Sequence, residues 1–458
     1  MSQQAYLSKD GHEITREEKK VLAGTLVGTT IEWYDFFIYA QAAGFVLAVL
    51  YFEPLGEESE TLAQIVAWAS IGISFLFRPL GAILAGWLGD RFGRKIVLVI
   101  TLMGMGGATF LIGLLPTFAS WGMFAPVLLI ALRVIQGLSA GGEWGGAALL
   151  AVEHAPRHKR GLFGMYPQIG VPLGMILATL FMFALNAVLT EEQFLSWGWR
   201  VPFLFSFVLI IVGYFIRQRV EESPVFQEMK ERKKESSAPL KELVTTHKKY
   251  TFLAALIFAA NNAAGYLVIA FFASYGASAL GMTRTETLIA AFIGGLGWFV
   301  FTMLGGWVSD RIGRVLTFQI GYGIIILWAI PMWFLIDTGV VWIFALAIVL
   351  LTVGLGPSYG PQSALYAEMF PVSIRFSGVS IGYAFGSIIG GAFAPMIAQA
   401  ILDGTGQSWL IGAYISGLAI VSFIAVSLVP KDLQGINLHD DSERQGLGRG
   451  ALRGSSPS

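Results

Sequence analysis

Long apolar runs joined by short polar segments dominate the hydrophobic pattern of this chain. A helix of about 20 apolar residues spans the roughly 30 Å hydrocarbon core of a membrane. The chain contains twelve runs of that kind, and helices that are apolar on every face are unusual in a soluble fold. The runs are 21–50, 62–85, 96–115, 122–150, 161–188, 199–217, 250–275, 286–308, 315–336, 340–362, 375–401 and 409–429. The pattern predicts an all-α integral membrane protein with twelve transmembrane helices.

A polar segment after the sixth run divides the predicted helices into two groups of six. Residues 218–249 carry many charges of both signs, and residues 431–458 are rich in Gly, Ser and Arg, which is typical of disorder. The expected units are therefore an N-terminal tail (1–20), an N-terminal six-helix bundle (21–217), a connector (218–249), a C-terminal six-helix bundle (250–430) and a disordered tail (431–458).

Lys and Arg are concentrated on one side of the predicted helices. They occupy the N-terminal tail and the loops after even-numbered helices, whereas the loops after odd-numbered helices are short and acidic or neutral, with Arg284 as the exception. By the positive-inside rule, both termini are expected in the cytoplasm and the protein in the plasma (inner) membrane. The first run contains Glu32 and Asp35 and has no small-residue cleavage site behind it, so we expect a retained helix and not a signal peptide.

Composition excludes several classes of function. Of 458 residues, 55% are hydrophobic and only 13% are charged, about half the charged fraction of a typical soluble domain. Thirty basic and thirty acidic residues cancel, so no nucleic-acid partner is expected. The chain has no cysteine, and we find no metal-ligand cluster, phosphate loop or nucleophile–base motif. We therefore expect a monomer in the lipid bilayer that is not an enzyme and needs no metal or cofactor.

Two short motifs occur once in each group of six helices. Gly-Trp-Leu-Gly-Asp-Arg-Phe-Gly-Arg begins at Gly86, and Gly-Trp-Val-Ser-Asp-Arg-Ile-Gly-Arg begins at Gly306, 220 positions later. The spacing of Glu153, Pro156 and Arg160 after the fourth helix is repeated by Glu368, Pro371 and Arg375 after the tenth. Repeats at equivalent positions predict two pseudo-symmetric six-helix bundles.

These motifs resemble those of the major facilitator superfamily, as does Arg-x-x-Gln-Gly from Arg133 to Gly137. Four further segments resemble the metabolite:proton symporter family, which includes shikimate, 2-oxoglutarate, citrate and proline/betaine carriers. They are Glu-Trp-Tyr-Asp-Phe from Glu32, Phe-Arg-Pro-Leu-Gly from Phe77, Gln-Gly-Leu-Ser-Ala-Gly-Gly-Glu-Trp-Gly-Gly from Gln136 and Ser-Trp-Gly-Trp-Arg-Val-Pro-Phe from Ser196. The resemblance runs from about residue 21 to 430 and implies a proton-driven importer of a small metabolite. It also implies alternating access, with a central site between the two halves.

Ionisable residues within membrane helices are costly, so each is a functional candidate. Five stand out, all in the first half: Glu32, Asp35, Arg78, Arg133 and Glu143. All five histidines lie in tails or connectors, so a carboxylate must carry a coupled proton. Asp35 is the first candidate because it lies near mid-depth, and Glu32 lies one turn earlier on much the same face. The alternative is that one of these carboxylates only pairs with a nearby helix.

Arg133 also lies near mid-depth, with Gln136 on the same face. A guanidinium binds a carboxylate bidentately, so Arg133 is a candidate for substrate binding and proton coupling. The alternative is a structural pair with Asp35 or Glu32. Glu143 is a candidate for the proton path or a gate, against a structural role. We expect Arg78 to reach the interface as a structural residue, because it is placed near the end of its helix.

The repeated loop motifs are expected to form cytoplasmic gates whose charges pair in one state and separate in another. The gate candidates are Asp90, Arg91, Arg94, Glu153, Asp310, Arg311, Arg314, Glu368 and Arg375. Uncharged polar residues inside the helices are further candidates for substrate binding, against simple interhelical hydrogen bonding. They are Tyr34, Gln136, Tyr166, Gln168, Asn262, Tyr266, Tyr359, Gln362 and Tyr383. Trp197, Trp199, Trp333 and Trp342 are expected at the membrane interface.

The predicted function is proton-coupled symport of a small organic acid or zwitterion, because Arg133 favours a substrate with a carboxylate. An uncoupled facilitator or exchanger on the same fold is the nearest alternative. A channel or a transporter-like sensor is a more distant one, since two repeated gate motifs favour alternating access and the chain has no sizeable soluble output domain.

Overall fold

The computed structural model describes residues 14–52, 60–92, 94–218 and 245–439, and these residues form helices joined by turns. The first half contains α2 (Arg16–Ala42) with the π-helix η1 (Ala43–Phe52), α3 (Glu60–Leu76) with α4 (Arg78–Phe92), α5 (Arg94–Leu114), α6 (Phe118–Trp121), α7 (Phe124–Glu153), α8 (Arg160–Val188), α9 (Glu191–Gln193) and α10 (Arg200–Gln218). The 3₁₀ helix η3 (Arg157–Lys159) precedes α8, and the π-helix η4 (Phe194–Gly198) precedes α10.

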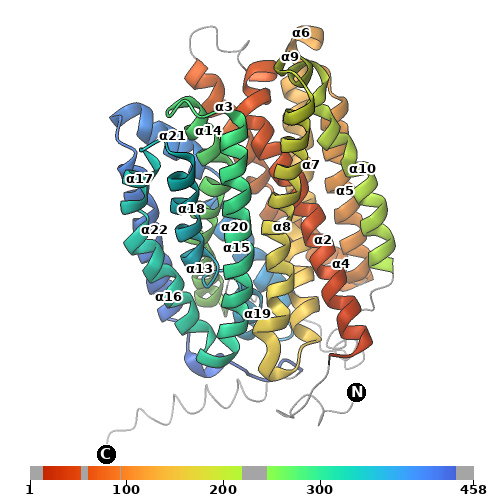
Figure 1. Cartoon of the computed structure of the whole chain (residues 1–458). Helices are drawn as coiled ribbons and strands as arrows, with labels where there is room; N and C mark the ends of the chain where they lie inside the picture. The colour runs from red at the N-terminus through yellow and green to blue at the C-terminus, as the bar shows by residue number, and fades with distance from the viewer. Residues whose placement is uncertain (1–13, 53–59, 93, 219–244, 440–458) are drawn as a thin grey trace, which may run out of the picture.

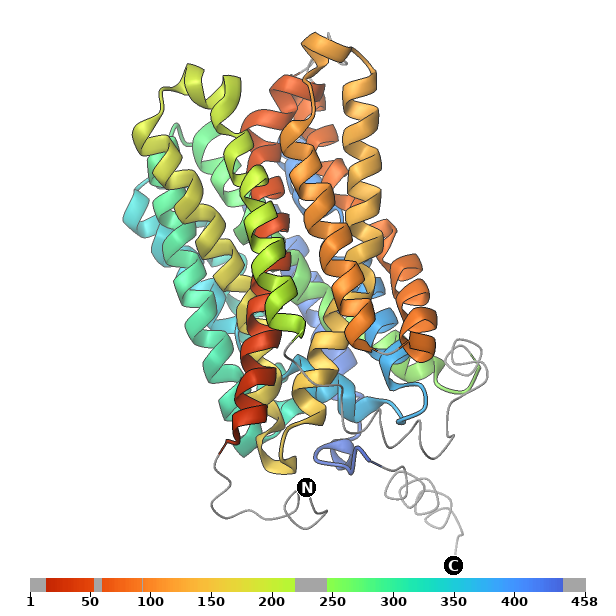
Figure 2. The ribbon, with the colours of Figure 1, turned by 90° about the vertical axis from the view of Figure 1, so that its right-hand side faces the viewer.

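The second half repeats this arrangement. It contains α13 (Lys248–Tyr266) with η5 (Leu267–Phe271) and α14 (Phe272–Ser278), α15 (Arg284–Ile312), α16 (Arg314–Trp328) with α17 (Pro331–Ile336), α18 (Val341–Leu355) with α19 (Gln362–Met369), α20 (Arg375–Gly390) with α21 (Ala394–Thr405), and α22 (Trp409–Ser427). Figures 1 and 2 show the two halves side by side as bundles of roughly upright helices.

Several predicted spans are made of two consecutive helices. Eight helices of the described chain are individually long and apolar enough to cross a membrane, and the remaining spans are interrupted. Three of these interruptions lie at prolines, because proline removes a backbone donor and disfavours helix at the residue before it, whereas neither α2 nor η1 contains a proline. Pro79 follows the break between α3 and α4, Pro331 begins α17, and Pro357 and Pro361 lie between α18 and α19.

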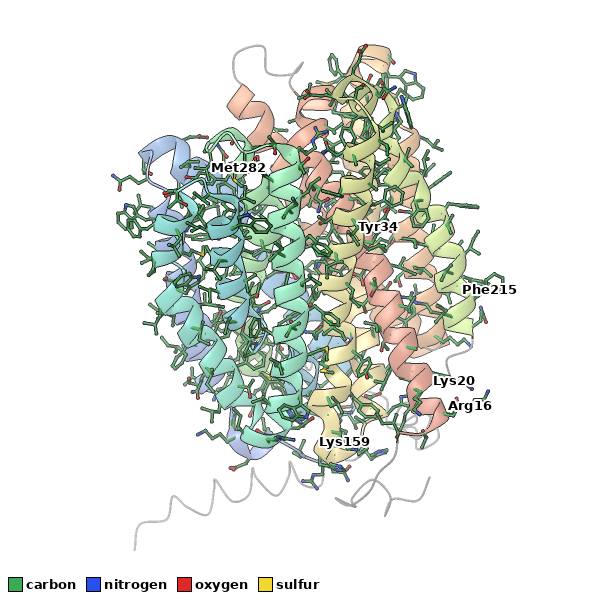
Figure 3. The ribbon with its side chains drawn as sticks, in the orientation of Figure 1. Arg16, Lys20, Tyr34, Lys159, Phe215 and Met282 are labelled. Atoms are coloured by element: carbon green, nitrogen blue, oxygen red, sulfur yellow. The ribbon has the colours of Figure 1, made fainter. Side chains whose placement is uncertain are left out.

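The outer surface of the bundle is apolar. Phe124, Phe215, Leu327 and Phe334 each leave more than half of their side-chain surface exposed, and Figure 3 shows Phe215 projecting from the outside of the bundle. Soluble monomers rarely expose such a continuous apolar surface, so these residues face lipid. Trp197 and Trp342 are exposed as expected. The expectation for Trp199 and Trp333 is wrong: both are fully buried, each against neighbouring aromatic rings.

The two ends of the bundle differ in charge. Arg16, Lys20 and Lys159 lie together at one end (Figure 3), which we call the basic end. The short helix η6 (Lys431–Leu433) and residues up to 439 also lie there. The sequence predicts disorder from residue 431, but Leu433, Ile436 and Leu438 are buried. The prediction is therefore wrong for 431–439, because these apolar residues pack onto the helix ends, and residues 440–458 lie outside the described residues.

Candidate functional site

Glycines on α7 bring the break between α3 and α4 into the interior of the first half. A Cβ added at Gly137 would lie 2.0 Å from the Ser74 carbonyl oxygen, and one at Gly141 would lie 2.1 Å from the Arg78 carbonyl oxygen. Only glycine permits backbones to approach this closely. As a result Arg78 is only 1% exposed and lies fourteen positions before the end of α4, about 21 Å along a helix axis. The expectation that Arg78 reaches the membrane interface is wrong.

Arg78 lies among aromatic rings. Its guanidinium carbon is 4.0 Å from the ring centroid of Phe75, 4.6 Å from that of Phe36 and 5.7 Å from that of Trp33. Tyr266, from the second half, stands edge-on to Phe75 with ring centroids 5.0 Å apart. The rings therefore surround a cation at the boundary between the two halves.

Arg133 is buried against α3. Its Nε donates to the Ser70 carbonyl (3.2 Å), its Nη2 donates to Ser74 Oγ (2.9 Å) and the Ile71 carbonyl (3.3 Å), and its Nη1 donates to Gln136 Oε1 (2.6 Å). Gln136 in turn donates to Thr109. The structure thus brings Arg133 and Gln136 together, but most of the guanidinium donors are occupied inside the first half. The structural pair with Asp35 or Glu32 is not formed.

Asp35 faces α10 and α5 of the first half. Ser206 Oγ donates to its Oδ1 at 2.6 Å, and a Cβ added at Gly106 on α5 would lie 3.7 Å from Oδ2. The carboxyl is 1% exposed and has no ion pair with any described residue. A buried carboxyl held only by neutral groups is well suited to exchange between protonated and charged forms.

Glu32 lies one turn before Asp35 on α2 and interacts electrostatically with Arg78. It is 3% exposed, and its Oε2 has no hydrogen-bond partner among the described residues. The charges that act on it are Arg78, Arg217 and Asp35. Glu32 is therefore the acidic side chain that interacts electrostatically with both the central arginine and the inner charges of the first half.

Glu143 forms a buried ion pair with Arg217 of α10. Arg217 donates from both terminal nitrogens to the Glu143 carboxylate and also to the Leu98 carbonyl, while Thr101 Oγ1 donates to Glu143 Oε2 at 3.0 Å. The guanidinium fits beside α2 because residue 28 is glycine; a Cβ there would lie 2.8 Å from Nη2. This pair joins α5, α7 and α10 within the first half.

Aromatic and amide side chains join the two halves near the centre. Trp144 of α7 stacks on Tyr383 of α20, with ring centroids 3.9 Å apart. The Trp144 indole donates to Gln168 Oε1 (2.8 Å), and Gln168 Nε2 donates to the Tyr359 carbonyl (3.1 Å) and to Gln362 Oε1 (3.3 Å). The structure thus brings four predicted substrate-site residues into one layer.

A cavity of ≈ 10 Å³ lies beside this layer, and Trp33, Asn262, Tyr266 and Tyr359 are among its lining residues. Such a space holds no metabolite, so the centre is closed in this state. Two other predicted residues lie elsewhere. Tyr34 donates to the Pro202 carbonyl within the first half (2.9 Å), and Tyr166 packs near the basic end against the cluster that contains Leu22 and Phe163.

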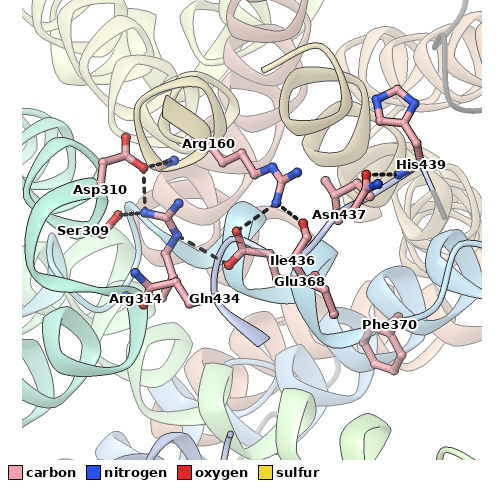
Figure 4. A network of polar contacts seen from close by, with 12 residues as sticks. Arg160, Ser309, Asp310, Arg314, Glu368, Phe370, Gln434, Ile436, Asn437 and His439 are labelled. Atoms are coloured by element: carbon pink, nitrogen blue, oxygen red, sulfur yellow. Dashed lines mark hydrogen bonds and ion pairs between the residues drawn. The ribbon is translucent and has the colours of Figure 1, made fainter. Parts of the chain in front are cut away.

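The basic end is closed by ion pairs between the halves. Glu153 of the first half pairs with Arg375 of the second (3.3 Å), and Glu368 of the second half pairs with Arg160 of the first (3.4 Å). The glutamate of each copy of the repeated Glu–Pro–Arg motif therefore pairs with the arginine of the other copy. All four side chains are buried, and Figure 4 shows the Arg160–Glu368 side of this arrangement.

The second repeated motif adds to the same closure. The Asp310 carboxylate accepts the backbone N–H groups of Gly161 and Leu162, each at 2.8 Å, at the first turn of α8. Arg314 pairs with Asp310 (2.7 Å) and reaches Glu368 (3.7 Å). Arg311 is exposed and lies over the Trp307 ring, outside this network. The side chains of Asp90, Arg91 and Arg94 lie outside the described residues.

The segment after α22 crosses the network. Arg160 donates to the Ile436 carbonyl (2.6 Å), Arg375 donates to the Leu438 carbonyl (3.0 Å), and the Arg314 N–H donates to Gln434 Oε1 (2.8 Å). The segment therefore contacts arginines of both halves (Figure 4). At the opposite end, the halves are joined by an exposed hydrogen bond from Asn186 to Thr285 (2.9 Å) and by the Arg284 guanidinium, 4.4 Å from the ring centroid of the buried Phe194.

Sequence reasoning missed three parts of this site. From the sequence, Arg217 is assigned to the basic connector because basic residues follow it. In the structure its guanidinium lies beside Gly28 and pairs with Glu143. The sequence places Arg78 near the end of its helix, but the helix continues to Phe92. The contacts of residues 434–438 use mostly backbone carbonyls, which leave no side-chain signal; the apolar Ile436 and Leu438 are the one available hint.

The chain is similar to known membrane transporters. Residues 21–249 and 227–440 match the family described as "Sugar (and other) transporter". The chain is 40% identical over 418 residues to the inner membrane metabolite transport protein YhjE of Escherichia coli K12, covering 89% of this chain and 93% of that protein. It is 35% identical over 421 residues to the shikimate transporter of the same organism (91% and 95%), and 29% identical over 435 residues to a putative proline/betaine transporter of Staphylococcus aureus strain COL (94% and 93%).

Solved structures share the fold. The proton:xylose symporter XylE bound to 6-bromo-6-deoxy-D-glucose superimposes with a TM-score of 0.76 at 16% identity, over 95% of this chain and all of that one. An inward-open conformation of XylE from E. coli gives a TM-score of 0.69 at 18% identity, over 94% and 99%. Identities this low describe the architecture alone.

Proposed function

The chain belongs to the sugar (and other) transporter family of the major facilitator superfamily, and on that premise we propose that it is a proton-coupled symporter of a small organic acid or zwitterion. The family, the twelve-helix fold and a transport function in place of an enzymatic one are confirmed as the sequence predicts. Proton coupling, the substrate class and the direction of transport belong to the proposal.

The main support for alternating access is that the two copies of the repeated motif form ion pairs with each other. Glu153–Arg375 and Arg160–Glu368 each join one half to the other, so both pairs must separate before the basic end can open. A buried charge that loses its partner is destabilised by several kcal/mol unless water or substrate replaces it. At the opposite end the halves are joined by the exposed Asn186–Thr285 hydrogen bond and by the Arg284 guanidinium over the buried Phe194 ring, and we propose that these contacts separate first.

The basic residues at one end support an orientation with that end, and both termini, in the cytoplasm. The closed basic end then corresponds to a carrier that loads from outside. Import follows if the substrate enters at the opposite end and the ion pairs open afterwards.

Asp35 supports proton coupling because it is a buried carboxyl held by a neutral hydroxyl and not by a cation. The named relatives support the substrate class: shikimate, proline and betaine each carry a carboxylate. A guanidinium at the boundary between the halves suits a carboxylate substrate.

The test is uptake into proteoliposomes of purified protein with an imposed pH gradient, inside alkaline. A panel of shikimate, 2-oxoglutarate, citrate, proline and betaine is offered, with and without a protonophore. We expect one compound to accumulate above its external concentration, and the protonophore to abolish that accumulation. Accumulation that survives the protonophore would refute symport. Equilibration without accumulation would favour the facilitator or exchanger, and unitary currents in planar bilayers would favour a channel.

A further inference from the structure

Arg78 differs from the other buried arginines of the described chain. Arg160, Arg217, Arg314 and Arg375 each form an ion pair, and Arg133 makes four hydrogen bonds. Arg78 is 1% exposed, yet its Nε and Nη2 have no hydrogen-bond partner among the described residues. A buried cation left in this condition costs several kcal/mol, so the position requires a function that repays it.

The aromatic rings around Arg78 leave its N–H groups available. Phe36 and Phe75 contact the guanidinium within the range of cation–π interactions. Ring faces do not satisfy the N–H donors, and an arginine fork binds a carboxylate through two such donors. The unpaired N–H donors of Arg78 and the aromatic rings around them together form a site that suits an anionic group.

Residues of the second half complete this site. Among the described residues, the buried hydroxyl groups of Tyr266 and Tyr383 have no hydrogen bond within 3.5 Å, although Tyr266 interacts with the Arg78 side chain and Tyr383 with that of Tyr359; the charge of Arg78 acts on both tyrosines. Tyr266 and Trp33 also line the small central cavity. A ligand bound to Arg78 therefore touches both halves, as a substrate that triggers alternating access must.

Glu32 is a buried carboxyl group whose charge interacts with that of Arg78. It interacts with Arg78, but no ion pair within 4.0 Å joins them. The other charged and titratable groups that act on Glu32 or feel its charge are Arg217 of α10, Asp35 of α2, and Tyr266, Tyr359 and Tyr383 of the second half. A second anion beside Arg78 would repel the Glu32 carboxylate, and a proton on Glu32 removes that repulsion.

We infer that Arg78 binds the substrate carboxylate and that Glu32 takes up one proton from solution as the substrate binds. This inference rests on the proposed function and names the anchor within it. The substrate class is a small monocarboxylate, including zwitterions whose cation can lie against the Trp33 and Tyr266 rings. Arg133, most of whose donors are occupied, then holds α7 against α3 and does not contact the substrate.

The experiment is isothermal titration calorimetry of the purified full chain in lipid nanodiscs with shikimate, proline and betaine. Titrations in two buffers with different ionisation enthalpies report the protons taken up. For the wild type we expect about one proton per carboxylate bound. Arg78→Gln should raise the Kd about 100-fold or more, and Arg78→Lys about 10-fold, because lysine keeps the charge but not the fork. Arg200→Lys, at the opposite end of the bundle, is the matched control and should keep the wild-type Kd.

Glu32→Gln should bind the same compound without proton uptake and with a Kd that no longer changes between pH 6 and 8. If a variant does not remain monodisperse, the ligand is changed and the protein is kept as wild type. The methyl ester of the bound acid, which has no carboxylate, should bind the wild-type protein at least 100-fold more weakly than the acid. Wild-type affinity in Arg78→Gln or for the ester, or no binding of any carboxylate, would overturn the anchor. Unchanged proton uptake in Glu32→Gln would overturn the linkage. Arg78-dependent binding without proton-driven accumulation would refute symport and leave the anchor standing.

Discussion

The burial of the ion pair between Arg217 and Glu143 predicts how much the free energy of unfolding falls when the arginine is removed. The Arg217→Met substitution removes a side chain that is 7% exposed and leaves a carboxylate that is 1% exposed. Glu143 then keeps one hydrogen bond, from Thr101. Removing one partner of a buried pair costs about 3–5 kcal/mol, because the remaining charge stays in a medium of low dielectric. We expect the free energy of unfolding to fall by about that amount.

The assay is SDS-induced unfolding in mixed micelles, followed by tryptophan fluorescence. The double variant Arg217→Met/Glu143→Gln should recover most of the loss, since two neutral groups replace the pair without an uncompensated charge. The exposed pair of Lys20 and Glu17 is the control: Lys20→Met should change the free energy of unfolding by less than about 1 kcal/mol. If Arg217→Met is as stable as the wild type, or the double variant is no better than the single one, the reasoning is wrong.

Three further predictions follow from the same contacts. Asp35→Asn should abolish accumulation driven by a pH gradient while exchange of labelled substrate continues; full accumulation by this variant would exclude Asp35 as a proton carrier. Gly141→Val should reduce stability by about 3 kcal/mol or more, because its Cβ meets the α4 backbone at 2.1 Å, whereas Gly107→Val meets nothing within 4 Å. Glu153→Gln weakens an ion pair between the halves. A cysteine introduced in this cysteine-free chain at Ser363, which is buried on α19 against Gly164 of the first half, should then react faster with maleimide; unchanged labelling would argue against a gate.

The repeated motifs illustrate how far a sequence pattern reaches. The spacing of Glu153 to Arg160 and of Glu368 to Arg375 is visible in the sequence and predicts two equivalent gates. The exchange of partners between the two copies is not visible there, because each ion pair joins residues more than 200 positions apart. Only the packing of one half against the other shows that the gates are one structure.

The two buried carboxyl groups of α2 show what the sequence pattern does not determine. Asp35 and Glu32 lie three positions apart, and the sequence places them on much the same face of one helix. Their surroundings nevertheless differ: Asp35 meets Ser206, 171 positions away, while Glu32 feels the central arginine. The rotation of α2 about its own axis decides this difference, and contacts such as that of Gly174 with the Tyr34 backbone set the rotation.

The sequence by itself determined the membrane class, the twelve spans, the internal repeat and the choice of buried charges. Each of these follows from local rules: the bilayer dictates the length and apolar content of every span, and a charge inside a span is conspicuous wherever its partner lies. Only the tertiary structure decided which charges are paired. Arg133 and Arg78 are both arginines in apolar helices, yet close glycine contacts bring Arg133 to the carbonyls of α3 and leave Arg78 among rings with unused donors. That difference depends on distances between helices far apart in the chain, and no local pattern records it.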